Sequence, residues 1–185
     1  MAGSLKPVIF LDDGGVMNDN ALRGPQWQRL LGEFMPQHLG GQAEVWAEAN
    51  RQVFDKLFDN YLERRFGRKD VSFRDYQKAY AVDWVHSMCK LVGVPLPAEA
   101  DCLDLLKKAN AYVTPLVRSA LPGVIEAIRV LKGAGYAIFT ASNETSDALE
   151  GYLMGMGVVD CFERLYGSDL VGILKETPNT KSSRE

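Results

Sequence analysis

Three short segments, each placed after an expected strand, carry the side chains that could do chemistry. Asp12–Gly15 follows the run Val8–Leu11, and Ser142-Asn143 follows the run Tyr136–Thr140. The third segment extends from Ser168 to Lys175. A carboxylate in such a position can act as a nucleophile or bind a divalent cation, and a hydroxyl beside backbone N–H groups can hold an anion. Taken singly, the first segment is equally typical of a turn, the second is more typical of a helix N-cap, and the lysine of the third is typical of a solvated surface charge.

The elements that must position these segments predict an α/β fold. The continuous apolar run Val8–Leu11 predicts a strand that is buried on both faces of a parallel sheet. Later in the chain, residues 121–131 predict a helix, 136–140 a strand, 145–156 a helix and 164–167 a weak third strand. This alternation predicts a parallel, Rossmann-like sheet with right-handed crossovers.

The segment between the first strand and its crossover helix has helical patterns. Apolar residues recur at three- and four-residue spacing over 45–62, and Ser72 with Asp75 has the form of a capping box. Gly93 is expected to end that helix, and a further helix is expected over 98–113. We therefore expect an α/β core over 5–17 and 118–176, a helical cap over 18–117 and a polar tail over 177–185.

The composition limits the classes of partner and compartment. The net charge of −3 gives no reason to expect nucleic acid as a partner. The start, Met1 to Phe10, is too short for a signal peptide, and no later stretch reaches the roughly 18 apolar residues of a membrane span. Cys89, Cys102 and Cys161 form no CxxC pair, so neither a zinc site nor a disulfide framework is indicated. We expect a protein of the cytoplasm that does not bind a membrane.

The three segments together, in this order, resemble the first three motifs of the haloacid dehalogenase-like (HAD) hydrolases. The run Asp12–Met17 is similar to the Asp-Leu-Gly-Gly-Val-Leu variant of the first motif, with Asp12 at the nucleophile position. Ser142-Asn143 matches the second motif, and Lys175 matches the lysine of the third motif. An insertion after the first strand resembles the helical first-class cap of that family.

The resemblance implies a mechanism and a cofactor. Asp12 would attack phosphorus and form an aspartyl-phosphate, which water then hydrolyses. Mg²⁺ would be held by Asp12 and the carbonyl of Gly14. Ser142, with Asn143 beside it, would bind the phosphoryl oxygens, and Lys175 would neutralise their charge. The implied activity is a magnesium-dependent phosphatase whose partner is a small phosphorylated metabolite, with the cap closing over the site.

Two departures from the family pattern lead to further expectations. Gly14 stands where most of these phosphatases have a second aspartate as acid/base, a catalysis worth about 10²–10⁴-fold. A shifted register would give that role to Asp13, but Leu11 would then occupy the nucleophile position. The fourth motif and its strand are not found after Lys175, which leads us to expect a C-terminally truncated member with impaired activity. Without that strand the apolar edge Val8–Leu11 would be open, and an open edge favours self-association.

Two alternative functions stay open at this point. A 2-haloacid dehalogenase uses the same aspartate, needs no metal and needs no acid at Gly14, because halide leaves unprotonated. It would require a cationic clamp for the substrate carboxylate, and the sequence does not rank Arg23, Arg51 and Arg118 for that role. A non-catalytic fragment or interaction protein is the third class, and it predicts no turnover of any phosphate ester.

Overall fold

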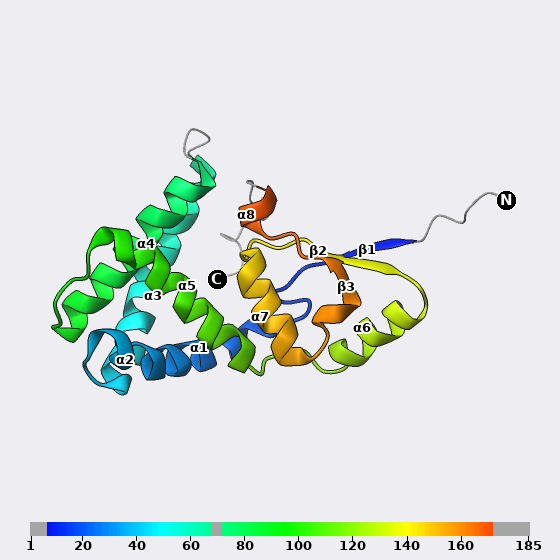
Figure 1. Ribbon diagram of the computed structural model, residues 1–185, viewed down its shortest axis with the longest axis horizontal. Helices are drawn as coiled ribbons and strands as arrows, with labels where there is room; N and C mark the ends of the chain where they lie inside the picture. The colour runs from blue at the N-terminus through cyan, green and yellow to red at the C-terminus, as the bar shows by residue number, and fades with distance from the viewer. Residues whose placement is uncertain (1–6, 68–71, 172–185) are drawn as a thin grey trace, which may run out of the picture.

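The computed structural model describes residues 7–67 and 72–171 (Figure 1). Its sheet, within these ranges, consists of β1 (Val8–Leu11), β2 (Ala137–Thr140) and β3 (Phe162–Arg164), in the order β1-β2-β3. Both strand pairs are parallel, as expected, and the register of β1 on β2 runs from Val8↔Ala137 to Leu11↔Thr140. Parallel strands joined by helices give the expected α/β class, with the helical insertion after the first strand.

Helices on the core side of the molecule connect these strands. They are α6 (Val124–Gly133) before β2 and α7 (Ser146–Met156) after it, followed by the 3₁₀ helix η2 (Val159–Cys161) and, after β3, the short helix α8 (Ser168–Val171). Ile138 of β2 is fully buried in one apolar cluster with Ile128 of α6 and Leu153 of α7. Both helices therefore pack on the face of the sheet to which Ile138 points.

The expectation that the first strand is buried on both faces was wrong for the part of the chain that the structure describes. Val8 is 55% exposed and Phe10 is 57% exposed. Side chains alternate across a strand, so these residues lie on the face opposite the α6–α7 cluster. Phe10 stacks there on Phe139 with ring centroids 5.3 Å apart. Among the described strands β1 pairs with β2 alone, and self-association through its other edge stays a prediction.

The third strand also differs from the expectation, because it runs over Phe162–Arg164 instead of 164–167. It pairs with β2 through Ile138↔Phe162 and Phe139↔Arg164, with an irregular register between the two rungs. Beyond Arg164 the backbone no longer extends the ladder. The carbonyl of Tyr166 instead accepts a hydrogen bond from Ser142 N at 3.2 Å, and so it supports the loop that follows β2.

The helical insertion follows β1 and lies to one side of the sheet in Figure 1. It comprises α1 (Asn20–Phe34), α2 (Pro36–Leu39), α3 (Ala43–Gly67), α4 (Phe73–Val92), α5 (Glu99–Val113) and the 3₁₀ helix η1 (Thr114–Leu116). Both predicted caps of α4 are confirmed: Ser72 accepts a hydrogen bond from Asp75 N at 3.1 Å, and Gly93 ends the helix with φ 78°. None of the helices within the described ranges is both long and apolar enough to cross a membrane.

The insertion has its own apolar cluster, which extends onto the core. Trp46, Trp84 and Met88 are buried at its centre, and Ala148 and Tyr152 of α7 belong to the same cluster. Close approach of α7 to η1 requires a residue without a side chain, because a Cβ at Gly151 would lie 1.8 Å from Thr114 Oγ1. Helix α7 thus contributes to both clusters. The division into core and cap at residues 17/18 and 117/118 stays a prediction.

Candidate functional site

The ends of β1 and β2 bring the first two predicted motifs to one edge of the sheet. Leu11 and Thr140 are register partners, and Ala141 N donates to Leu11 O at 2.9 Å. Asp12 and Ser142 therefore begin neighbouring loops at the carboxyl ends of two parallel strands. Open α/β sheets bind ligands at this edge.

The loop after β1 is a tight turn that leaves Asp12 partly exposed. Asp12 Oδ1 accepts a hydrogen bond from Asp13 N at 2.8 Å. The carbonyl of Asp13 accepts from Met17 N at 2.8 Å and from Asn18 N at 3.0 Å, which closes the turn. Gly15 has φ 78° with open space around it, so the turn needs a residue that tolerates left-handed backbone there. The turn holds the Asp12 carboxylate at the start of the loop, where solvent reaches it.

Asp13 has a different environment from Asp12, because its side chain is fully buried. Its Oδ1 accepts from Asn18 Nδ2 at 2.6 Å, and its Oδ2 forms an ion pair with Arg23 Nη1. Ser119 Oγ in turn donates to Asn18 Oδ1 at 2.6 Å. A carboxylate held in such a network has a structural role. The structure therefore gives no support to the shifted register in which Asp13 serves as the acid.

Gly14 has ordinary backbone geometry, and the space beside it is occupied by two polar side chains. A Cβ at Gly14 would lie 2.9 Å from Asn20 Oδ1 and 3.2 Å from Arg23 Nη2. The side chain of a second aspartate at this position would thus meet an amide and a guanidinium. Neither group is an acid that could protonate a leaving alcohol at neutral pH.

Ser142 lies in the loop between β2 and α7 and is 8% exposed. Its hydroxyl oxygen accepts a hydrogen bond from Glu144 N at 3.2 Å. The helix N-cap interpretation does not apply to Ser142, because α7 starts at Ser146 with Thr145 as N-cap. Asn143 is partly buried in the same loop. Two backbone N–H groups of this loop are engaged within the protein, since Ser142 N donates to Tyr166 O and Glu144 N donates to Ser142 Oγ. Anion binding by this turn stays a prediction.

The last predicted site residue is Lys175, and two further aspartates, Asp19 and Asp169, lie in the segments that follow β1 and β3. Lys175 lies outside the described residues. Asp19 is the N-cap of α1 and accepts from Ala21 N at 2.8 Å. Asp169 accepts from Ser146 N at 2.7 Å and from Ser146 Oγ at 2.5 Å. Both carboxylates thus bind helix N-termini, which is a structural use of their charge.

The donor atoms at the sheet edge suit a hard cation only in part. The carboxylate of Asp12 and the carbonyl of Gly14 are oxygen donors, which Mg²⁺ prefers. Among the described residues, no three His, Cys, Asp or Glu side chains gather into a metal-binding group. Mg²⁺ is commonly held by one or two carboxylates together with water and substrate phosphate. The donor set fits that mode of binding, with substrate supplying ligands, and does not form a preformed protein cage.

The sequence did not rank Arg23, Arg51 and Arg118 as a clamp for a substrate carboxylate, and the structure distinguishes them by their positions. Arg51 pairs with Glu48 at 2.5 Å on the surface of α3, and Arg118 Nη1 donates to the carbonyl of Pro115 at 2.8 Å. Arg23 alone of these three lies beside Gly14, through its Nη2. The contact of Arg23 with this loop was not foreseen, because no spacing rule links a residue on a helix to a loop ten residues earlier.

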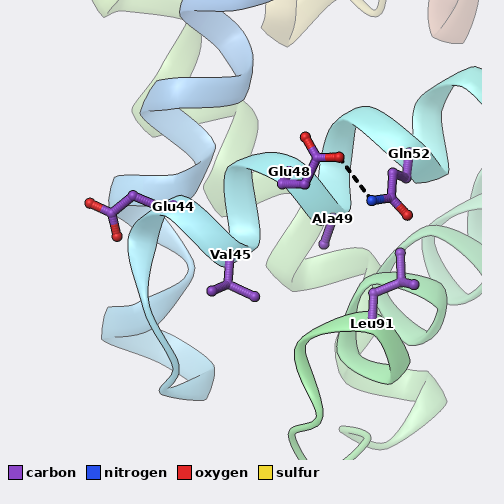
Figure 2. Close-up of a pocket in the computed structure, with 6 residues that line it drawn as sticks. All are labelled: Glu44, Val45, Glu48, Ala49, Gln52 and Leu91. Atoms are coloured by element: carbon purple, nitrogen blue, oxygen red, sulfur yellow. Dashed lines mark hydrogen bonds between the residues drawn. The ribbon is translucent and has the colours of Figure 1, made fainter.

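A pocket of about 380 Å³ lies elsewhere, on the cap (Figure 2). Its lining comes from α3 and from the end of α4: Glu44, Val45, Glu48, Ala49, Gln52 and Leu91. Gln52 Nε2 donates to Glu48 Oε1 at 2.8 Å along its rim. A hydrogen bond from Arg51 lowers the pKa of Glu48 to about 2, so this carboxylate is ionised at neutral pH. No lining residue belongs to the loops of Asp12 or Ser142, so the pocket is separate from the candidate site.

Comparison with known proteins adds structural similarity and no sequence match. No protein-family model and no curated protein matches the sequence. The L-2-haloacid dehalogenase of Xanthobacter autotrophicus matches with a TM-score of 0.51 and 19% identity over 92% of this chain and 60% of that one. The HAD-hydrolase YfnB of Bacillus subtilis, bound to magnesium, matches with 0.54 and 16% over 92% of this chain and 67% of that one.

A third solved structure extends the comparison. The defluorinating L-2-haloacid dehalogenase Rha0230 matches with a TM-score of 0.55 and 17% identity over 94% of this chain and 64% of that one. The chain spans about 60% of the length of the Xanthobacter dehalogenase. At these identities the likeness establishes the fold, and it covers nearly the whole of this chain. The described α/β sheet with its helical insertion therefore has the fold of the haloacid dehalogenase-like hydrolases.

Proposed function

We propose that this chain is a hydrolase with Asp12 as nucleophile, and that it acts as a magnesium-dependent phosphatase on a small phosphorylated metabolite. The observation that carries the proposal is the placement of Asp12 and Ser142 in neighbouring loops, after the register partners Leu11 and Thr140. A partly exposed carboxylate and a serine hydroxyl in the neighbouring loop, at one sheet edge, support transfer of a phosphoryl group to an aspartate.

Each residue has a distinct part in this chemistry. Asp12 attacks phosphorus, the ester oxygen departs, and water then releases phosphate from the aspartyl-phosphate. Ser142 and Asn143 hold the phosphoryl oxygens during both steps, and Lys175 neutralises their charge. Asp12 and the Gly14 carbonyl would hold Mg²⁺, which lowers the cost of the negative charge on the phosphoryl group.

The surroundings of Gly14 favour one class of leaving group. Asn20 and Arg23 occupy the space where an acid side chain would lie, and neither can give up a proton easily. An alkoxide leaves poorly without a proton, whereas a phenolate or carboxylate leaves well. We therefore expect aryl or acyl phosphates to be turned over faster than alkyl phosphates.

The test is the release of phosphate from p-nitrophenyl phosphate by the purified chain, with Mg²⁺ and with EDTA. Asp12→Asn keeps the shape of the side chain but removes the nucleophile, so turnover should be lost. Asp104→Asn is the matched control, because Asp104 is 66% exposed on α5 and pairs with Lys108. If Asp12→Asn keeps more than about a tenth of the rate, the loss is under ~1.4 kcal/mol and Asp12 is not the nucleophile.

A 2-haloacid dehalogenase is the second candidate, because two of the solved structures with this fold are L-2-haloacid dehalogenases. A halide leaves without a proton, which also suits the glycine at position 14. Release of chloride from 2-chloropropionate in the presence of EDTA would support this candidate and exclude the phosphatase. Absence of turnover on both substrates, with and without Mg²⁺, would favour a non-catalytic role.

A further inference from the structure

Arg23 on α1 contacts both loops that follow the strands of the candidate site. Its Nη1 forms the ion pair with Asp13, the residue next to Asp12. Its Nη2 lies 3.6 Å from Glu144 Oε1, in the loop that contains Ser142. The Arg23 side chain is 16% exposed, that of Asp13 is 1% exposed and that of Glu144 is 38% exposed. A single guanidinium thus links a buried carboxylate of one loop to a more accessible carboxylate of the other.

Contacts with side chains of α1 and α7 fix the orientation of the Arg23 guanidinium. Arg23 Nη2 donates to Asn20 Oδ1 at 2.7 Å, one turn earlier on α1. The Arg23 Cζ lies 5.2 Å from the centre of the Tyr152 ring on α7. Trp27 Nε1, one turn later on α1, donates to the Tyr152 hydroxyl at 2.8 Å. Two consecutive turns of α1 therefore contact α7 and hold Arg23 in place.

The charge balance around Arg23 favours this arrangement. Burial alone would lower the pKa of Arg23, but the charges of Glu144 and Asp13 raise it above its ordinary value. Burial raises the pKa of the Tyr152 hydroxyl, which stays neutral beneath the guanidinium. Without the cation, the buried carboxylate of Asp13 would lose its ion pair, and a second carboxylate would stand in the neighbouring loop.

Short covalent and hydrogen-bonded paths lead from both ion pairs to the proposed catalytic side chains. Asp13 N donates to Asp12 Oδ1 at 2.8 Å, so the position of Asp13 constrains the carboxylate of Asp12. Glu144 N donates to Ser142 Oγ at 3.2 Å, so the position of Glu144 constrains the hydroxyl of Ser142. The distance between the two loops is thus set by a side chain that belongs to neither of them.

We propose that Arg23 is a positioning residue through which the first helix of the insertion holds the Asp12 loop and the Ser142 loop in their working arrangement. The inference rests on the proposed function for the roles of Asp12 and Ser142, and it assigns Arg23 no contact with the reacting atoms. It makes the assembly of the site depend on docking of α1 against α7 and the sheet edge. A displacement of α1 would release both loops together.

The test compares Arg23→Gln with Arg29→Gln, the same substitution six residues later on α1, in a surface ion pair with Glu33. Amide hydrogen exchange is followed by mass spectrometry in peptides that cover 12–18 and 141–146. Arg23→Gln should speed exchange in both loops at least tenfold, while peptides from α3 and α4 keep their rates. Arg29→Gln should leave both loops unchanged.

Two further readouts separate positioning from general stability. Glu144→Gln removes one ion pair only, and it should speed exchange in 141–146 without affecting 12–18. For turnover of p-nitrophenyl phosphate, Arg23→Gln should lower kcat at least tenfold with KM changed less than threefold, and Arg23→Lys should recover part of the loss.

Unchanged exchange in both loops after Arg23→Gln would overturn the proposal, as would equally faster exchange throughout the chain. The exchange measurement needs no substrate. If the unsubstituted chain shows no turnover, the proposed function fails, and the exchange pattern still decides whether Arg23 couples the two loops.

Discussion

Leu11 and Thr140 lie opposite each other in the last rung of the parallel pair β1–β2, and their side chains differ in how well their surroundings suit them. Leu11 packs against the cluster around Ile138. Thr140 is fully buried, and its Oγ1 is the buried side-chain oxygen without a hydrogen-bond partner in the described part of the chain. This rung precedes both Asp12 and Ser142, so its stability bears directly on the candidate site.

Replacement of Thr140 by valine should therefore stabilise the protein. Valine has the same shape and removes a buried hydroxyl whose unmade hydrogen bond costs about 1–3 kcal/mol. We expect Thr140→Val to raise the free energy of unfolding by about 1 kcal/mol, measured by urea denaturation. Ser119→Ala is the contrasting variant and should destabilise, because Asn18 Oδ1 would lose its donor. A Thr140→Val variant that is less stable than the parent would show that the hydroxyl has a partner.

An acid introduced at position 14 should change the preference among substrates. The backbone of Gly14 is outside the left-handed region, so an aspartate can be accommodated if the Asn20 and Arg23 side chains move away from the new Cβ. We expect Gly14→Asp to raise turnover of alkyl phosphates by about tenfold and of aryl phosphates much less, since phenolates leave without a proton.

The neighbouring glycine provides the control for this experiment. Gly15 has φ 78°, where an aspartate is strained. Gly15→Asp should lower thermal stability without any gain on alkyl phosphates. Equal effects of Gly14→Asp on both substrate types would argue that position 14 does not face the leaving group.

The sequence predicted the parts of this fold that depend on local patterns. The apolar runs located β1 and β2, and Ser72 and Gly93 marked both ends of α4 because capping requires these residue types within a few positions. The sequence did not reveal that Val8 and Phe10 are exposed, because exposure depends on which helices cover a face of the sheet. It also misplaced β3, whose extent depends on an irregular pairing with β2.

The sequence predicted the candidate site in part as well. Asp12 and Ser142 could be placed at one edge, because parallel strands bring their carboxyl ends together. The link from Arg23 to Asp13 and Glu144 could not be predicted, since Glu144 is far from the other two residues in the sequence. They come together in the folded chain, where Arg23 and Trp27 of α1 contact Tyr152 of α7.

The cysteines should differ sharply in reactivity. Cys89 and Cys102 are fully buried, and burial raises the pKa of both thiols, so less thiolate is present near neutral pH. Cys161 is partly exposed in η2. At pH 8 a thiol reagent should label Cys161 in the native protein at least about a hundredfold faster than the other two, which react through unfolding. Cys161→Ser should abolish the fast phase, and three equal rates would contradict the described burial.

The open side of β1 predicts association between copies of the chain. Val8 and Phe10 are more than half exposed, and among the described strands β1 pairs on one side only. We expect sedimentation velocity to show concentration-dependent association, reduced by Phe10→Lys because a charge on an edge strand opposes pairing. Val130→Lys, on the exposed side of α6, is the control and should not reduce it. A monomer at every concentration would refute the expectation.

The central claim is that Asp12 carries the phosphoryl group, and trapping of the covalent intermediate tests it most directly. The chain is mixed with Mg²⁺ and an acyl or aryl phosphate, quenched in acid, and reduced with labelled borohydride, which converts an aspartyl-phosphate to a stable labelled alcohol. Peptide mass spectrometry then locates the label. The account predicts label on Asp12 that is absent from the Asp12→Asn variant. Turnover without label at Asp12, or with label on another residue, would contradict it.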